Sequence, residues 1–207
     1  ILGDRVRMQD HVMDDGIYIR SMATRGHLGG LSLATPQAVR VLDALGWPWV
    51  LVETVGVGQV EVDIAGAADT TIVVVNPGWG DAVQANKAGL MEVADIFVIN
   101  KADRKGADET RRDIQQMLEL SSLGDWEPPI LMTVATEQVG VEELWKAVDA
   151  HRRYLKECGE LELRRSRRID AELSEIVNRS LEKRVVATMD RPETAELKKK
   201  LMDGEID

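Results

Sequence analysis

Hydrophobic and polar positions alternate along the chain in blocks that predict strands and helices in turn. Short apolar or alternating runs predict strands at 17–23, 49–54, 70–75, 95–99 and 130–134. Between these runs, apolar residues at helical spacing predict helices at about 37–45, 81–93, 107–120 and 140–156. Because runs such as TTIVVV carry few polar residues, we expect an α/β fold with a mostly parallel sheet, strands buried on both faces and flanking helices.

The pattern changes near residue 160. From there to residue 202 the chain carries many charges and no strand signal, while apolar residues recur at helical spacing, as at Leu173, Ile176 and Leu181. The pair Arg191-Pro192 interrupts this helix, and a shorter helix follows. A helix with an apolar stripe and no sheet to cover usually packs on a partner. We therefore predict a domain at 1–157 and a C-terminal helical dimerisation arm at 158–207.

Charge and composition exclude several classes of protein. The 207 residues carry 36 acids and 26 bases, a net charge of -10, which argues against nucleic acid and anionic membrane as partners. The basic cluster at 164–168 has no interleaved aromatic residues, so we interpret it as a solvated helix face or an interface patch. No apolar run is long enough for a membrane span. A single cysteine, Cys158, excludes an intramolecular disulfide and favours a cytoplasmic location.

The sharpest motif is Asn100-Lys101-Ala102-Asp103, directly after the predicted strand DIFVI. An aspartate carboxylate can accept hydrogen bonds from both N1–H and the N2 amino group of guanine, and adenine offers no such donor pair. A buried acceptor left unpaired would penalise the wrong base. The asparagine side chain can meet the base or tie neighbouring loops together, and the lysine stem can lie along the base plane. The motif predicts guanine recognition.

A second motif, ETVGVGQ, begins with Glu53 at the end of the run WVLV. A carboxylate at the end of a strand can hold Mg²⁺ through its water ligands. The glycines, Gly56 among them, let the following loop approach a terminal phosphate and rearrange when it leaves. We interpret the segment as a switch loop, although a helix start after a glycine turn stays open. Gln59 is a weaker candidate for orienting a water molecule.

Three other segments carry weaker signals. Asp4, in ILGDR, is a candidate magnesium ligand or base, but a surface residue is the simpler interpretation. The loop NPGWGD leads into a predicted helix on which Asp81, Gln84 and Lys87 fall near one another. Two interpretations stay open: Asp81 caps this helix, or the loop is mobile and senses the nucleotide. Val134-Ala135 ends the last predicted strand, where GTPases often have Ser-Ala and the backbone meets the guanine oxygen.

The phosphate-binding motif G-x-x-x-x-G-K-[ST] does not occur in the 207 residues. A base reader and a switch loop without a phosphate cradle form an incomplete nucleotide site. We expect the phosphate loop to precede Ile1 in the complete protein. Alone, the 207 residues would then hydrolyse GTP poorly or not at all.

Together these motifs resemble the MeaB/ArgK family of P-loop GTPases. The resemblance rests on ILGDRVRM, RGHLGG, VLVETVGVGQ, NPGWGDAVQANKAG and ADIFVINKAD, and it extends through VGVEELW. It covers residues 1–157 strongly and the arm more loosely. It implies a GTP-hydrolysing, metallochaperone-like protein that binds GTP, GDP and Mg²⁺. It also implies a homodimer that assists an adenosylcobalamin-dependent methylmalonyl-CoA mutase in loading and protecting its cofactor.

The resemblance assigns roles to the candidate residues by position. Glu53 and Asp4 would be catalytic carboxylates near magnesium, and Gly56 would contact the γ-phosphate through its backbone. Asn100, Lys101 and Asp103 would bind guanine, with Val134 and Ala135 in the second base-binding loop. The segment from Gly78 to Lys87 would be an extra switch that contacts the mutase.

Two other interpretations stay open. The chain can be a non-catalytic GTPase fragment that serves as a dimerisation or mutase-binding module. It can also be a kinase or another nucleotide-dependent transferase on a related fold, although Asp103 argues against ATP as its substrate.

Overall fold

The computed structural model describes residues 8–11, 13–22, 34–54, 66–78, 93–120 and 124–204. The chain divides into two compact units, Ile1–Leu161 and Glu162–Asp207. Among the described residues, the first unit contains a β-sheet with its helices, and the second contains helices.

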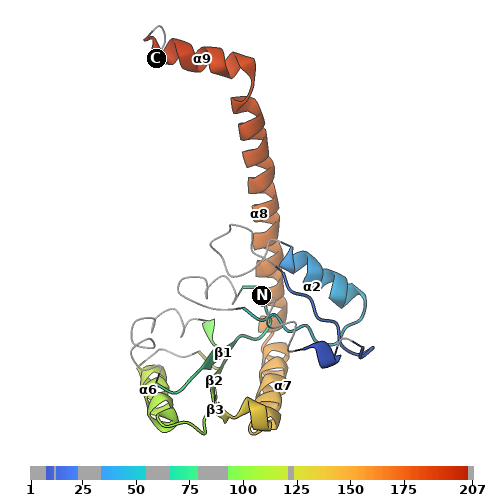
Figure 1. Cartoon of the computed structure of the whole chain (residues 1–207), viewed down its shortest axis with the longest axis vertical. Coiled ribbons are helices and arrows are strands. Elements are labelled where there is room, and N and C mark those ends of the chain that lie inside the picture. Colours follow the sequence, from blue (N-terminus) through green and yellow to red (C-terminus); the bar gives the residue numbers. More distant parts are fainter. Residues whose placement is uncertain are drawn as a thin grey trace. The chain divides into compact units, whose positions relative to one another are not determined.

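The described part of the first unit contains one parallel sheet of three strands (Figure 1). The strands are β1 (Ile72–Val75), β2 (Ile96–Asn100) and β3 (Ile130–Thr133), in the order β1-β2-β3. The register places Val74 beside Val98 and Val98 beside Leu131. These three strands confirm the predictions for 70–75, 95–99 and 130–134, and their parallel pairing confirms the α/β fold class.

Helix α6 (Ala107–Glu119) packs on one face of the sheet. Phe97 and Ile99 of β2 and Val75 of β1 join Ile114 and Met117 of the helix in one buried core, in which Phe97 is 1% exposed. Alternate residues of a strand point to the same face, so these β2 residues define the α6 side. The early acids Asp108 and Glu109 favour this helix because they lie near the positive end of its dipole.

Helix α7 (Val141–Glu157) covers the other face, on the far side of the strands from α6 (Figure 1). Ile96 and Val98 of β2 point to this side, and α7 contributes Leu155, which is fully buried. The central strand is thus buried on both faces, as predicted. The edge strand β1 differs, because Val74 is 57% exposed.

Two predicted strands, at 17–23 and 49–54, are wrong where the structure describes them. Residues 17–22 and 49–54 have no strand conformation there. A strand is stabilised by its ladder with a neighbour, and Leu51 is 84% exposed, outside any sheet core. Trp49 instead packs edge-on against Trp145 of α7, with ring centroids 4.6 Å apart, and Arg152 lies over its ring. Aromatic packing on α7 replaces strand pairing in this segment.

The remaining short elements of the first unit are helical. They are η1 (Gln9–His11), α2 (Thr35–Ala44) and η2 (Ala135–Glu137). Helix α2 matches the predicted helix at 37–45 and ends in a glycine turn, because Gly46 has a φ of 81° and its N–H donates to the carbonyl of Asp43 at 2.9 Å. The predicted helix at 81–93 lies outside the described residues apart from Val93.

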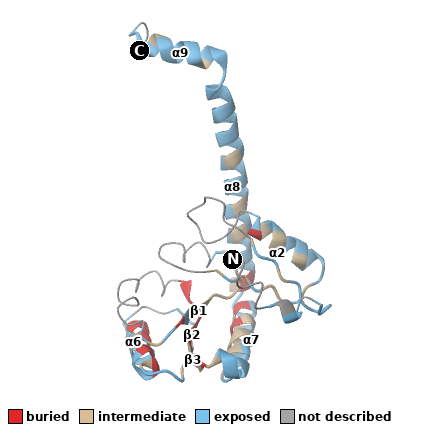
Figure 2. Cartoon of the chain, viewed as in Figure 1, coloured by how far each residue is buried: buried red, intermediate tan, exposed pale blue. Residues whose placement is uncertain are grey.

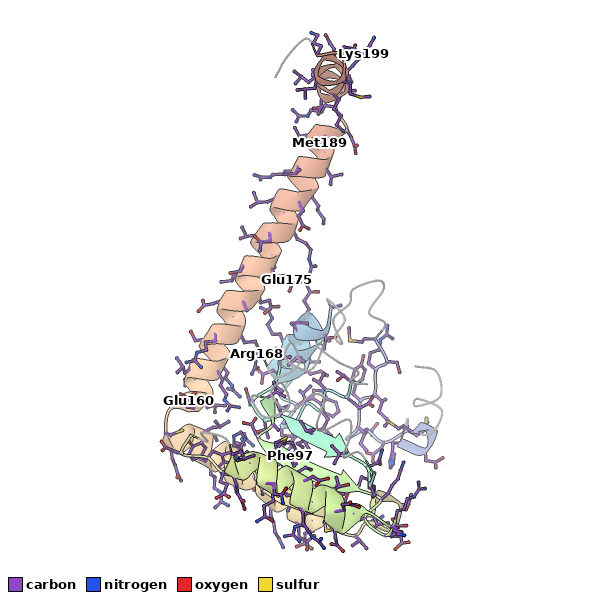
Figure 3. All side chains as sticks on the ribbon, turned by 90° about the vertical axis from the view of Figure 1, so that its left-hand side faces the viewer. Phe97, Glu160, Arg168, Glu175, Met189 and Lys199 are labelled. Carbon is purple, nitrogen blue, oxygen red and sulfur yellow. The ribbon has the colours of Figure 1, made fainter. Side chains whose placement is uncertain are left out.

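The second unit consists of most of α8 (Glu160–Met189) and of α9 (Pro192–Met202). Both helices and the break between them match the sequence prediction, with Pro192 in the first turn of α9. Side chains of α8 stand away from its axis in several directions, as Arg168, Glu175 and Met189 show (Figure 3). Figure 2 shows that nearly all of this unit is exposed or half-buried. Among the described helices, none is long and apolar enough to cross a membrane.

Candidate functional site

The carboxyl ends of β2 and β3 bring the base-reading motif and the second predicted base loop together. Asn100 is the last residue of β2 and lies beside Thr133, the last residue of β3. The chain then turns sharply, because Lys101 has a φ of 58° and its carbonyl accepts the N–H of Arg104 at 3.0 Å. Lys101 and Asp103 are both exposed at this edge. Ligands of parallel α/β sheets bind at this edge of the strands.

The side chain of Asn100 joins the two loops. Its Oδ1 accepts hydrogen bonds from Thr133 Oγ1 and from the backbone N–H of Ala135, each at 3.2 Å. Because a backbone N–H can only donate, the atom facing Ala135 must be the amide oxygen. The Asn100 amide nitrogen therefore points elsewhere as a donor. The structure favours the loop-tying role, and this orientation also leaves the Asn100 NH₂ group able to donate to a base.

The loop after β3 closes on itself. Val134 and Val139 form an antiparallel bridge, with N···O distances of 3.0 Å and 3.2 Å in its two hydrogen bonds. Between them lies η2, followed by Gln138 with a φ of 59°. A loop held by its own backbone can present N–H and C=O groups to a ligand with little ordering cost.

These two loops line a surface pocket with a volume of about 130 Å³. Its lining contains all five predicted guanine-binding residues, together with two residues that the sequence analysis did not assign, Arg104 and Thr136. The full lining is Asn100, Lys101, Asp103, Arg104, Val134, Ala135 and Thr136. The pocket thus offers an amide donor at Asn100, two carboxylate acceptors at Asp103 and the aliphatic stem of Lys101.

The other predicted site residues are not brought to this pocket by the described structure. Glu53 is exposed in the irregular segment 49–54. Asp4, Gly56, Gln59, Asp81, Gln84 and Lys87 lie outside the described residues. Within the described ranges, no three His, Cys, Asp or Glu side chains gather as a metal site. Of the two carboxylates predicted to lie near magnesium, the structure therefore describes Glu53 alone.

The beginning of the loop after β1 is held against α6. The N–H of Gly78 donates to Thr110 Oγ1 at 3.3 Å, and Thr110 is 2% exposed. An added Cβ on Gly106 would lie 3.6 Å from the Gly78 nitrogen. The segment that the resemblance assigns to an extra switch thus begins against the helix that follows the base-reading motif.

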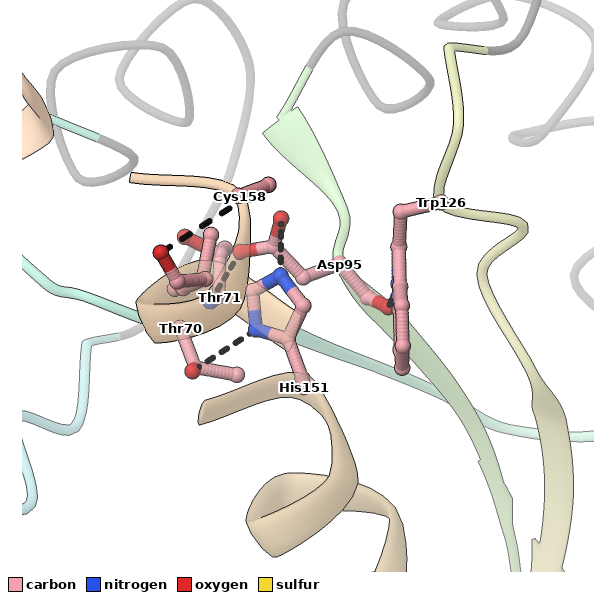
Figure 4. Close-up of polar contacts among 7 residues, drawn as sticks. Thr70, Thr71, Asp95, Trp126, His151 and Cys158 are labelled. Carbon is pink, nitrogen blue, oxygen red and sulfur yellow. Dashed lines mark hydrogen bonds and ion pairs between the residues drawn. The ribbon is translucent and has the colours of Figure 1, made fainter. Parts of the chain in front are cut away.

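A second polar cluster, missed by the sequence analysis, lies at the opposite, amino ends of the strands (Figure 4). His151 of α7 is fully buried, with Nδ1 2.9 Å from Thr70 Oγ1 and Nε2 3.3 Å from Asp95 Oδ1. The Nε2 contact lacks hydrogen-bond geometry, so we treat it as a close polar contact and not as a hydrogen bond. Asp95 Oδ2 accepts the N–H of Thr71 at 2.8 Å. The cluster ties α7 to the starts of β1 and β2.

Aromatic rings enclose this cluster. Trp126 Nε1 donates to the carbonyl of Asp95 at 2.9 Å, and its ring lies 4.7 Å from that of His151 and 5.1 Å from that of Tyr154. Burial raises the pKa of the Tyr154 phenol, and the nearby Cys158 and Asp125 raise it further. The sequence offers only a weak signal for this cluster, a single histidine within the amphipathic helix α7. Only the packing of α7 identifies it as a structural group.

Comparison with known proteins places the chain among GTPases. A Pyrococcus abyssi protein that bears a GTPase name is 50% identical over 212 residues, covering 100% of this chain and 65% of its own length. The Escherichia coli GTPase ArgK is 38% identical, covering 78% of this chain and 50% of ArgK. The mouse mitochondrial methylmalonic aciduria type A homolog is 32% identical, covering 80% of this chain and 41% of that protein.

A solved structure and a family profile agree with these relatives. The crystal structure of a LAO/AO transport system kinase matches with a TM-score of 0.59 and 27% identity, over 81% of this chain and 54% of that one. The profile of the family described as methylmalonyl-CoA mutase-associated GTPase MeaB matches residues 1–190. The chain spans about two thirds of the length of its Pyrococcus relative and half of ArgK. With its parallel sheet and its paired loops at Asn100 and Ala135, the chain belongs to the MeaB family of GTPases.

Proposed function

We propose that the protein binds GTP and GDP through the pocket at the carboxyl ends of β2 and β3 and hydrolyses GTP. The observation that carries the proposal is the oriented amide of Asn100, whose oxygen is occupied by Thr133 and Ala135. The Asn100 NH₂ group can then donate a hydrogen bond to a ligand, and guanine offers N7 and O6 as acceptors. Asp103 lines the same pocket and supplies the acceptors for the guanine N1–H and N2 amino groups.

We expect the Asp103 carboxylate to distinguish guanine from adenine at the pyrimidine edge of the base. Adenine presents an acceptor at N1 and no amino group at C2, so the Asp103 carboxylate would lose both donors and face an acceptor instead. Such a mismatch costs more than a missing contact because the charged oxygens have been partly desolvated without a partner. Lys101 adds packing along the base through its aliphatic stem.

Hydrolysis requires groups beyond this pocket. We propose Glu53 and Asp4 as the carboxylates that hold Mg²⁺, directly or through water, Gly56 as a γ-phosphate contact and Gln59 as a candidate for water positioning. Carboxylate oxygens suit Mg²⁺, and the ion, when bound, neutralises charge on the phosphates. In a protein that carries these 207 residues together with a phosphate-binding loop, Glu53→Ala should lower magnesium-dependent phosphate release from GTP. Unchanged release would remove Glu53 from this role.

Titration of the protein with fluorescent GDP, with fluorescent ADP as the control, tests the central proposal. Saturable binding of GDP at least tenfold tighter than ADP supports guanine recognition. Equal affinities would contradict the role of Asp103. No binding of either nucleotide would favour the alternative of a non-catalytic module.

We further propose that the partner is an adenosylcobalamin-dependent methylmalonyl-CoA mutase, whose cofactor loading and protection the protein assists. The support is the description of the matched family as mutase-associated. Asp81, Gln84 and Lys87 are proposed to couple nucleotide state to this partner, in a segment whose start is anchored at Thr110. Co-sedimentation with such a mutase should differ between GDP and a non-hydrolysable GTP analogue. Identical sedimentation in both nucleotides would remove the switch role.

A homodimer through the C-terminal arm is proposed from the exposed apolar residues of α8. Six of them follow one another at intervals of four, and all are 45–60% exposed: Ile169, Leu173, Val177, Leu181, Val185 and Met189. Residues four apart form a continuous ridge that can pack into the groove of a second helix. Light scattering at micromolar concentration should give the mass of a dimer, and a monomer would exclude this role.

A cytoplasmic location, proposed from the lone Cys158, accords with these roles.

A further inference from the structure

Thr133 does not line the pocket, but it makes two hydrogen bonds to the segment Asn100–Asp103, which does. It is 3% exposed, and its Oγ1 donates to Asn100 Oδ1 at 3.2 Å. Its carbonyl accepts the N–H of Ala102 at 3.0 Å, within the Asn100–Asp103 motif. One buried residue at the end of β3 therefore contacts both the Asn100 amide, whose orientation the Ala135 N–H sets, and the backbone that leads to Asp103.

Gly140 sets the position of the loop that follows Thr133. Its φ is 76°, and an added Cβ would lie 2.2 Å from the carbonyl oxygen of Met132 and 3.1 Å from Thr133 Cγ2. A carbon cannot approach a backbone oxygen that closely, so any side chain here would force the loop away from β3. The neighbouring residue Val139 forms the bridge with Val134 that closes the loop. The close approach of Gly140 to β3 thus fixes where Ala135 meets Asn100.

We propose that Thr133 and Gly140 are positioning residues for base recognition, a role that rests on the proposed guanine-nucleotide function. Thr133 helps to hold the Asn100 amide toward the imidazole edge of the purine. Gly140 keeps the loop 134–139 close enough to β3 for Ala135 to donate to Asn100. Neither residue contacts the pyrimidine edge, which is read by Asp103. Losing either one should weaken purine binding without changing discrimination at the guanine 2-amino group.

Thr133 is tested with a pair of variants. Thr133→Val keeps the shape but removes the hydroxyl, so the affinity for GDP should fall about tenfold, the equivalent of one hydrogen bond. The affinity for IDP, which lacks the 2-amino group, should fall by the same factor, so the GDP/IDP ratio stays constant. Thr133→Ser keeps the hydroxyl and should bind GDP within about twofold of wild type. Equal GDP affinity of Thr133→Val and wild type would overturn the role.

Gly140 is tested against a glycine of the same backbone conformation. Gly159 has a φ of 80° but no atom within 4 Å of an added Cβ, so Gly159→Ala carries the backbone strain without the collision. Gly140→Ala should lower GDP affinity about tenfold or more. It should also speed hydrogen exchange at the amides of Val134, Ala135 and Val139. Gly159→Ala should do neither. Equal behaviour of the two variants would overturn the role of Gly140.

The two proposals can fail separately. Guanine-selective binding by wild type together with unaltered GDP affinity in Thr133→Val and Gly140→Ala overturns the positioning role alone. A wild type that binds no guanine nucleotide overturns the proposed function, and base positioning falls with it. Hydrogen exchange of the loop amides, measured without nucleotide, then still shows whether Gly140 shapes the loop.

Discussion

The strands of the sheet carry polar side chains at both ends, and the two ends are built in opposite ways. At the amino ends, Asp95 is 7% exposed and His151 is fully buried, and their polar atoms face protein groups. At the carboxyl ends, Lys101 and Asp103 are exposed and line a pocket with Asn100.

This difference follows from the cost of burying polar groups. A buried polar group must find its partner inside the protein, so the amino-end cluster stabilises the fold and has little left to offer a ligand. A binding site needs donors and acceptors at a surface, held in place by others that are already paired. The oxygen of Asn100 is paired with Thr133 and Ala135, as expected of a residue that positions a binding site. The comparison predicts that changes at the amino end alter stability and changes at the carboxyl end alter binding.

The largest expected effect on stability is at Asp95. Asp95→Ala removes the acceptor of the Thr71 N–H and the carboxylate facing His151, so the free energy of unfolding should fall by roughly 2–4 kcal/mol. Urea denaturation followed by circular dichroism measures it. Asp95→Asn is the matched control, because its amide oxygen can still accept from Thr71, and it should lose less. A change in the GDP/ADP affinity ratio of folded Asp95→Asn would break the division between the two ends.

Asp103→Asn should have the largest effect on binding. The affinity for GDP should fall about 100-fold, because two hydrogen bonds to a charged acceptor are lost or reversed. XDP should gain, since xanthine has a carbonyl at C2 to which an asparagine N–H can donate. Calorimetric titration with both nucleotides measures the exchange. Asp108→Asn, an exposed change on α6, is the control and should bind GDP as wild type does.

For Asp103→Asn, stability is the second readout. The side chain is exposed, so the free energy of unfolding should stay within about 0.5 kcal/mol of wild type. A loss of unfolding free energy comparable to that expected for Asp95→Ala would show that Asp103 also stabilises the fold. It would contradict the division between the two ends of the strands.

The smallest expected effect on stability is at Lys101, at the carboxyl end of β2. This residue has a φ of 58°, a conformation that favours glycine, so Lys101→Gly should leave the free energy of unfolding unchanged or raise it by up to about 1 kcal/mol. GDP affinity should nevertheless fall, because the variant loses the aliphatic stem that is proposed to pack along the base. Gln138→Gly relieves the same strain at a φ of 59° outside the pocket lining and should keep GDP affinity. Equal GDP affinities for the two variants would remove Lys101 from base binding.

Prediction from sequence succeeded for elements with a strong local pattern. The runs at 70–75, 95–99 and 130–134 became strands, and the break at Arg191-Pro192 became the end of α8. Prediction failed at 17–22 and 49–54, where apolar residues suited a strand but strand pairing depends on a neighbour. The aromatic contact between Trp49 and Trp145 joins residues far apart in the chain, and no local pattern announces it.

The sequence by itself determined the class of fold and the place of the Asn100–Asp103 motif after a buried strand, because these depend on periodicity and on residue types in a row. Only the tertiary structure decided what Asn100 does with its oxygen and why residue 140 must be glycine. It also decided that His151 is a buried structural group facing Asp95. These facts depend on distances between segments that meet only after folding, and hydrogen bonding and steric exclusion act over those distances.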